Sequence, residues 1–178
     1  MTALSARIAR TAAPLLALVW LLAACGAAGP LTAPYDAGLV EATSAYHQRA
    51  GALLAQLEDE GRAAAYADYA PRWAEAVAGA DALFVRATAN AQGLGDGGRA
   101  LAQTINAALA AGTGGASADY AGLSLSQAQY YDLRLLVLRW RESHAAGPVS
   151  ADVWTARRGQ LNDAVAAVLL LETARAGG

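Results

Sequence analysis

YYDLRLLVLRW, residues 130–140, is the stretch that decides the fold, because its apolar residues recur at helical spacing on two sides. Ser124 and Gln127 precede it with the spacing of a capping box, so we expect a helix to begin there. Two apolar faces indicate burial between layers or a surface for a partner. One stripe holds Ala128, Tyr131, Leu135 and Leu138, and the other, a possible partner or oligomer surface, holds Leu133, Leu136, Val137 and Trp140.

Two long helices are predicted before this stretch. The first has an apolar stripe that repeats at spacings of three and four and ends at Glu58–Gly61. The second covers Tyr66–Ala91, with Pro71 in the first turn of its main part, where a proline costs no hydrogen bond. The stripe of the first helix contains Leu39, Thr43, Tyr46, Ala50, Leu53 and Leu57.

A short helix over Arg99–Ala111 is expected between two glycine-rich segments, Gly93–Gly98 and Gly112–Gly122, which are typical of connections. The last helix follows Pro148, with Ser150 as its N-cap, and runs to about Arg175. The chain therefore predicts an all-α fold, an antiparallel helical bundle of four long helices plus one short helix, over residues 36–178. The residues of the last helix that should face inward are Trp154, Leu161, Val165 and Val168.

The first residues have the layout of an export signal. Arg7 and Arg10 supply positive charge, and Leu15–Leu22 (LLALVWLL) is strongly apolar. This apolar core is shorter than the roughly 20 residues that cross a bilayer as a helix. A conventional cleavage site has small residues at positions −3 and −1, and Leu22 does not fit that pattern for cleavage before Cys25.

Leu22-Ala23-Ala24-Cys25 resembles the lipobox of bacterial lipoproteins at all of its positions. The resemblance implies that residues 1–24 are removed after Ala24 and that the Cys25 thiol receives a diacylglyceryl group. Two or three acyl chains hold a protein stably on a membrane. Gly26, in place of an aspartate, favours the outer membrane by the same resemblance, with the domain facing the periplasm. The alternative is an ordinary signal peptide cut near Ala28.

Residues 25–35 contain mostly small residues and two prolines, and they predict a lipidated tether ahead of the helical domain. The rest of the chain loosely resembles a group of uncharacterised small helical proteins of proteobacteria. This resemblance supports a helical fold and implies no activity. The similar parts are Tyr35-Asp36, Phe84-Val85-Arg86-Ala87, Leu125–His144 with Gly147, and Leu169–Glu172.

Composition argues against several kinds of site. Cys25 is the only cysteine, Met1 is the only methionine and lysine does not occur, which excludes c-type haem, Met–His haem, a P-loop and a Schiff-base enzyme. Neither His47 nor His144 has a glutamate three residues before it, as a di-iron bundle requires. The net charge of −2 gives no electrostatic footprint for nucleic acid. We expect no metal, no cofactor and no catalytic residue.

The remaining polar residues have modest interpretations. His144 lies near the end of its helix, where it favours the negative end of the helix dipole, and His47 borders the first apolar stripe. Arg157 points toward the edge of the core, where its charge needs a carboxylate partner. Arginines are locally abundant, and solvated helix faces or salt bridges explain them more simply than a binding site does. The candidate anion or partner contacts are Arg134, Arg139, Arg141, Arg157 and Arg158.

Three functional classes follow from these patterns. The preferred hypothesis is a lipid-anchored, non-enzymatic envelope lipoprotein that acts as an interaction or assembly factor for an envelope protein partner or a second copy. The alternative is a carrier of a small apolar ligand or lipid between the helices. An enzyme is third, because no nucleophile–base or acid–base set can be named. The residues that would line the carrier's cavity are Tyr46, Tyr66, Trp73 and Tyr131.

Overall fold

The computed structural model describes residues 33–112 and 122–176, and every regular element in these residues is a helix. The elements are α2 (Ala37–Glu60), the short 3-10 helix η1 (Gly61–Ala63), α3 (Tyr66–Ala91), α4 (Asp96–Gly112), α5 (Leu125–Ala146) and α6 (Ala151–Ala176). The prediction of an all-α fold is confirmed. None of the helices in the described residues is long and apolar enough to cross a membrane.

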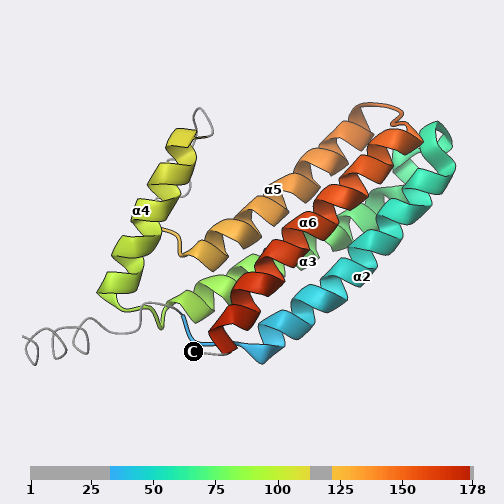
Figure 1. The fold of residues 1–178 in the computed structure, drawn as a ribbon. Helices are drawn as coiled ribbons and strands as arrows, with labels where there is room; N and C mark the ends of the chain where they lie inside the picture. The colour runs from blue at the N-terminus through green and yellow to red at the C-terminus, as the bar shows by residue number, and fades with distance from the viewer. Residues whose placement is uncertain (1–32, 113–121, 177–178) are drawn as a thin grey trace, which may run out of the picture.

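The four long helices lie side by side, and we call them the helical body (Figure 1). α2 packs against α3 and α6, and α5 packs against the same two helices. α4 stands apart and touches the helical body at α5. The core contains the predicted stripe of α2 and the predicted inward residues of α6, together with Trp73 and Tyr130. Both stripe predictions are therefore confirmed.

Local signals set the ends of the helices. The Asp36 carboxylate accepts a hydrogen bond from the Leu39 N–H at 3.1 Å and so caps the start of α2. Gly61 has a φ of 54°, a conformation that favours glycine, and it ends α2. The predicted capping box of Ser124 and Gln127 is present at the start of α5. These caps account for both ends of α2 and for the start of α5.

One helix boundary and the position of one proline differ from expectation. α4 begins at Asp96, inside the segment expected to be a connection. α3 begins at Tyr66, which places Pro71 in the second turn rather than the first. The nitrogen of Pro71 therefore cannot make the helical hydrogen bond to the carbonyl of Ala67. Most of the second glycine-rich segment, residues 113–121, lies outside the described residues.

The end of the predicted tether packs against the helical body. Ala33 is 3% exposed, and the carbonyl of Pro34 accepts a hydrogen bond from Asn90 Nδ2 at 2.9 Å. These two residues therefore lie against the described helices, and the tether stays a prediction. Tyr35, the next residue, is largely exposed.

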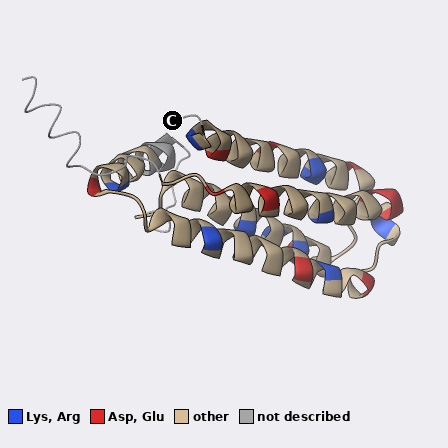
Figure 2. Ribbon diagram, turned by 90° about the horizontal axis from the view of Figure 1, so that it is seen from below, with Lys and Arg blue, Asp and Glu red and all other residues tan. Residues whose placement is uncertain are grey.

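Charged residues are spread along the helical body (Figure 2). Basic and acidic side chains occur on all the long helices, and several form pairs between helices. A distribution of this kind neutralises charge locally instead of building a field of one sign. The described residues therefore present mixed charge along the helices.

Candidate functional site

The expected partner surface on α5 lies in the core. Leu133, Val137 and Trp140 are buried between the helices, and Leu136 packs against the same cluster while half-buried. The expectation of an open surface is corrected by this burial. In the other stripe of α5, Ala128 is buried, and Tyr131, Leu135 and Leu138 are half-buried.

The structure does not bring the five candidate arginines together. Arg134 pairs with Asp81 on α3, whereas Arg158 pairs with Glu58 on α2, with 3.2 Å between Nη2 and Oε2. These carboxylates neutralise two of the charges on different sides of the helical body. The remaining members are Arg157 on α6 and, on α5, the exposed Arg139 and the half-buried Arg141.

Arg157 lies at the core edge as predicted, but its contacts differ from the expected carboxylate. Its guanidinium carbon lies 4.5 Å from the centre of the Trp154 ring, and Nη2 donates a hydrogen bond to Ser143 Oγ at 2.8 Å. Burial lowers the pKa of Arg157 below its usual range. The cation–π contact with tryptophan takes the place of an ion pair.

His144 belongs to a buried aromatic group, the histidine cluster, formed with Tyr66, Tyr69, Trp73 and Trp154. Trp73 Nε1 donates a hydrogen bond to His144 Nδ1 at 2.9 Å, and His144 Nε2 lies 3.0 Å from the carbonyl oxygen of Ala64. Because an indole N–H can only donate, Nδ1 accepts and Nε2 carries the proton. His144 is therefore a neutral core residue, which corrects its interpretation as a helix-dipole partner.

The other end of α5 holds a buried ion pair, the carboxylate cluster of Ser126, Glu172 and Arg175. Arg175 Nη1 donates to the two carboxylate oxygens of Glu172 at 2.9 and 3.1 Å, and Ser126 Oγ donates to Oε1 at 2.6 Å. Glu172 is fully buried. Ser126 and Glu172 line neither hollow described below. The cluster therefore joins α5 to α6, and Arg175 is its member that also lines a hollow.

Sequence reasoning missed the carboxylate cluster. Glu172 and Arg175 lie three residues apart on a helix with many apolar residues, a spacing that allows an ion pair on one face. This spacing is the feature of the sequence from which the ion pair could have been predicted. Ser126 offered none, because its partner lies far along the chain.

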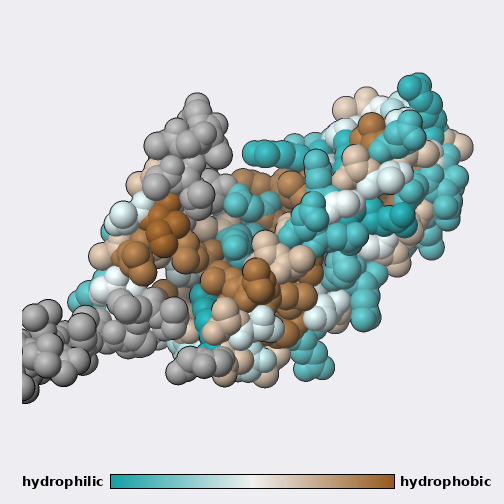
Figure 3. All heavy atoms as spheres, viewed as in Figure 1, coloured by the Kyte–Doolittle hydropathy of each residue, from teal (hydrophilic) through white to brown (hydrophobic). Residues whose placement is uncertain are grey.

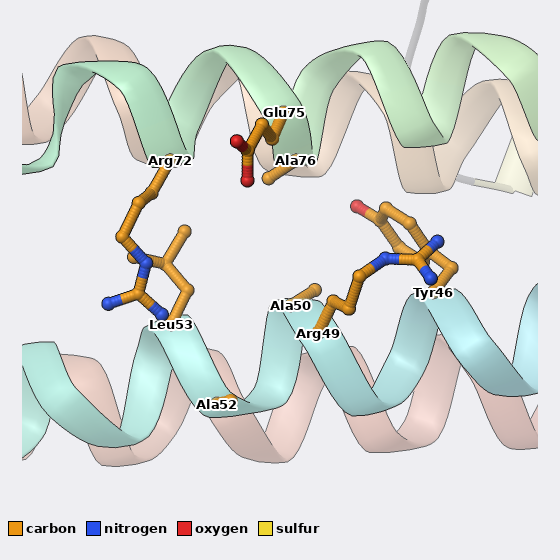
Figure 4. Close-up of a pocket in the computed structure, with 8 residues that line it drawn as sticks. All are labelled: Tyr46, Arg49, Ala50, Ala52, Leu53, Arg72, Glu75 and Ala76. Carbon is orange, nitrogen blue, oxygen red and sulfur yellow. The ribbon is translucent and has the colours of Figure 1, made fainter.

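A groove runs along the seam between α2 and α3, and we call it the α2–α3 groove. Its first section has a volume of about 450 Å³, and its second section, of about 490 Å³, shares Tyr46 and Arg49 with the first. The seam stays open because small residues face each other across it, among them Ala50, Ala76 and Gly79. The first section is lined by Tyr46, Arg49, Ala50, Ala52, Leu53, Arg72, Glu75 and Ala76 (Figure 4).

Tyr46 lies where the two sections meet. Its residue is 2% exposed, and its hydroxyl has no hydrogen-bond partner among the described residues. The ring lies against the backbone of α3, where a Cβ at Gly79 would come within 2.9 Å of Tyr46 Cδ2. Burial raises the pKa of Tyr46, and the positive charge of Arg49 opposes this rise. The hydroxyl is therefore a neutral, unpaired polar group at the wall of the groove.

The other residues expected to line a ligand cavity lie elsewhere. Trp73 is buried in the histidine cluster, and Tyr66 packs beside it. Tyr131 packs against Phe84, with 5.6 Å between the ring centres. Of the four predicted lining residues, Tyr46 is the one that the structure places at a groove.

A second, more apolar hollow of about 280 Å³ lies between α4 and the adjoining ends of α5 and α6. Figure 3 shows apolar residues gathered on both sides of it. Ala33 and Leu101 line it, and Arg175 supplies its charged residue. Ala33, the first described residue, therefore lies at this end of the molecule.

The residues of the predicted export signal and lipobox, including Ala24 and Cys25, lie outside the described residues. Within residues 33–112 and 122–176, no group of three or more His, Cys, Asp or Glu side chains is placed to hold a metal ion. Searches of protein-family models, of curated proteins and of solved structures return no match to this chain.

Proposed function

We propose that this chain is a non-enzymatic lipoprotein of the bacterial cell envelope, attached through acylated Cys25 and acting as an interaction or assembly factor. The observation that carries the proposal is the Leu22-Ala23-Ala24-Cys25 sequence behind a short apolar run. Gly26 supports attachment to the outer membrane, with the helical domain facing the periplasm. The resemblance to small helical proteobacterial proteins stays a prediction.

The proposed domain is an antiparallel bundle of the four long helices. Support comes from the packing, because each long helix contacts two others. Further support comes from short connections such as η1 between α2 and α3. Consecutive helices joined by short loops run antiparallel in helix bundles.

The proposed attachment also orients the molecule. From Cys25 to Ala33 the chain spans at most about 29 Å when fully extended. α3, with 26 residues, is about 39 Å long. The α4 end should therefore lie nearer the membrane than the η1 end. Exposed leucines at the α4 end, Leu101 (49%) and Leu170 (73%), support this orientation and are candidates for lipid or partner contact.

The anchor is tested by Cys25→Ser in the native host. We expect loss of the diacylglyceryl mass and release of the protein from the membrane fraction, because serine offers no thioether. Gly26→Ser is the matched control, since it changes the next residue and keeps the thiol. If Cys25→Ser stays in the membrane at its normal mass, the lipoprotein proposal is overturned.

The orientation is tested with a single added thiol, because Cys25 is the only natural cysteine. A spin label on Leu101→Cys should contact lipid in reconstituted membranes, whereas the same label on Arg62→Cys, in η1, should stay in water. Equal lipid contact for both labels would rule out the proposed orientation and leave the anchor standing.

The second candidate function is a carrier of a small apolar ligand or lipid between the helices. The α2–α3 groove favours it, because the volume of each section lies in the range of small-molecule sites, about 300–1,000 Å³. Incubation of the purified full chain with radiolabelled decanol tests it. Saturable binding supports the carrier, and absence of binding removes it without bearing on the anchor.

A further inference from the structure

We propose that the α2–α3 groove binds an anionic single-chain amphiphile, whose head group contacts the Tyr46 hydroxyl and the Arg49 guanidinium. The proposal rests on the second candidate function and is independent of the anchor at Cys25. It names the chemistry of the ligand and the two side chains that recognise it.

The first argument is the unpaired hydroxyl of Tyr46. Buried polar groups in proteins nearly always have a hydrogen-bond partner, and leaving one unpaired destabilises the folded state. Thr43, one turn earlier on α2, shows the usual arrangement, because its hydroxyl contacts both Leu39 and Tyr130. Around Tyr46 the groove is lined by alanines and by the charged residues Arg49, Arg72 and Glu75, and none of them forms a hydrogen bond with its hydroxyl. A ligand oxygen in the groove supplies the missing partner.

The second argument is charge. Arg72 already donates to Gln56 and lies over the Tyr69 ring. Arg49 has neither an ion pair nor a hydrogen bond among residues 33–112 and 122–176, and its side chain is exposed. Arg49 and Tyr46 line the same section of the groove, and both are drawn in Figure 4. Arg49 is thus the cation of this section that is free to meet an anion.

A ligand reaches the hydroxyl only after side chains at the groove move. The Tyr46 oxygen is covered in the described structure, although the residue lines both sections of the groove. Arg49 is a long, exposed side chain, and a change of its rotamer displaces no packed group. We infer that Arg49 turns with its anionic partner when the head group reaches Tyr46.

The remaining residues place the head and the tail. Glu75 projects from α3 between Arg72 and Tyr46, so an anion avoids the middle of the first section (Figure 4). The second section continues from Tyr46 along Ala42, Ala82 and Leu83, and its other lining residues include the charged Glu41 and Arg86. A hydrocarbon tail lies there while the head stays at Tyr46 and Arg49.

The experiment measures binding of labelled decanoate to the purified full chain in a fluorinated surfactant, by equilibrium dialysis. Decanol and decyltrimethylammonium serve as the neutral and the cationic probes. Tyr46→Phe and Arg49→Gln should each weaken decanoate binding about tenfold, because each removes a hydrogen bond to a charged group. Glu75→Gln should strengthen it several-fold by removing a like charge.

The matched control is Arg139→Gln, which removes an exposed arginine on α5 away from the groove and should leave binding unchanged. Thermal unfolding of each variant confirms that it folds. Equal decanoate binding by the wild type and Tyr46→Phe overturns the proposal. The proposal is also overturned if the protein binds decyltrimethylammonium more tightly than decanoate and Glu75→Gln abolishes that binding. Binding of decanol alone overturns the anionic ligand and retains the carrier, whereas binding of no probe overturns both.

Discussion

The two ends of α5 solve the problem of buried polar groups in different ways. At its start, the carboxylate cluster places a full negative and a full positive charge in the core and adds a serine hydroxyl. At its end, the histidine cluster contains no ion pair and joins a neutral imidazole to an indole N–H and a backbone carbonyl. Both arrangements join α5 to another helix of the helical body.

This difference predicts how much stability a substitution removes at each end of α5. A buried ion pair offsets a large desolvation cost only while both partners are present, so removal of one partner leaves an uncompensated charge. A neutral network loses only the desolvation cost of the groups left unpaired. The carboxylate cluster should therefore be the more sensitive of the two to a single substitution.

The largest expected effect is that of Arg175→Ala. It leaves the fully buried carboxylate of Glu172 with Ser126 as its partner, and we expect a loss of about 3–5 kcal/mol in the free energy of unfolding. Urea unfolding followed by circular dichroism measures this loss. A loss below that of the histidine cluster variant described next would reverse the ranking of the two ends.

Two controls sharpen this result. Asp96→Ala breaks an ion pair of the same spacing on α4, Asp96–Arg99, at an aspartate that is almost fully exposed, and should leave the unfolding midpoint unchanged. Combining Glu172→Gln with Arg175→Met removes both charges and should recover most of the stability lost in Arg175→Ala, because no buried charge remains unpaired.

His144→Leu breaks the histidine cluster. The substitution leaves Trp73 Nε1 and the Ala64 carbonyl without their partner, and we expect a loss of about 2–4 kcal/mol in the free energy of unfolding. His47→Leu is the matched control, because its ring contacts Asn162 in an exposed position. Similar losses in the two variants, measured by urea unfolding, would contradict the neutral network.

The helices could be predicted from the sequence because their signals are local. The capping box at Ser124 and the glycine at position 61 set boundaries through neighbouring residues. The stripe of α2 identified its buried face, because that helix is apolar on one side only. Periodicity along a single helix contains this information.

The orientation of α5 and the α2–α3 groove depend on contacts between distant residues. α5 is apolar on two sides, and the position of Trp73 and Trp154 beside His144 selects the side that is buried. Tyr130 belongs to neither predicted stripe, yet it is fully buried and bonded to Thr43. The groove arises because alanines and Gly79 meet across two helices, which no single helix pattern records.

Two buried tyrosines test whether a hydroxyl stabilises the core only when it has a partner. Thr43 Oγ1 donates to the Leu39 carbonyl at 2.7 Å, so the Tyr130 hydroxyl donates to Thr43 Oγ1, also at 2.7 Å. Tyr130→Phe should cost about 1 kcal/mol of unfolding free energy. Tyr46→Phe should be neutral or stabilising, because it removes an unpaired hydroxyl. Equal losses in urea unfolding would show that Tyr46 has a partner.

Burial raises the pKa of Tyr130 to about 12, so the hydroxyl stays neutral at physiological pH and the difference between the two tyrosines persists there.

The smallest expected effect concerns Asp36, which precedes α2 and pairs with Arg86 on α3. Asp36→Ala removes an N-cap and should cost about 1 kcal/mol at pH 7. The hydrogen bond from Arg86 lowers the pKa of Asp36. The resulting stabilisation is complete above the unfolded pKa of about 3.9 and is lost as the pH falls through the lower folded pKa.

Urea unfolding between pH 7 and pH 3 should therefore show the difference between wild type and Asp36→Ala narrowing toward acid. Asp96→Ala, at an almost fully exposed aspartate, is the control and should show little dependence on pH relative to wild type. A difference at Asp36 that widened toward acid would mean that its pKa is raised in the folded state. The pair with Arg86 would then not stabilise the ionised carboxylate of Asp36. The Asp36–Arg86 pair and the Glu172–Arg175 pair would then differ in more than their burial.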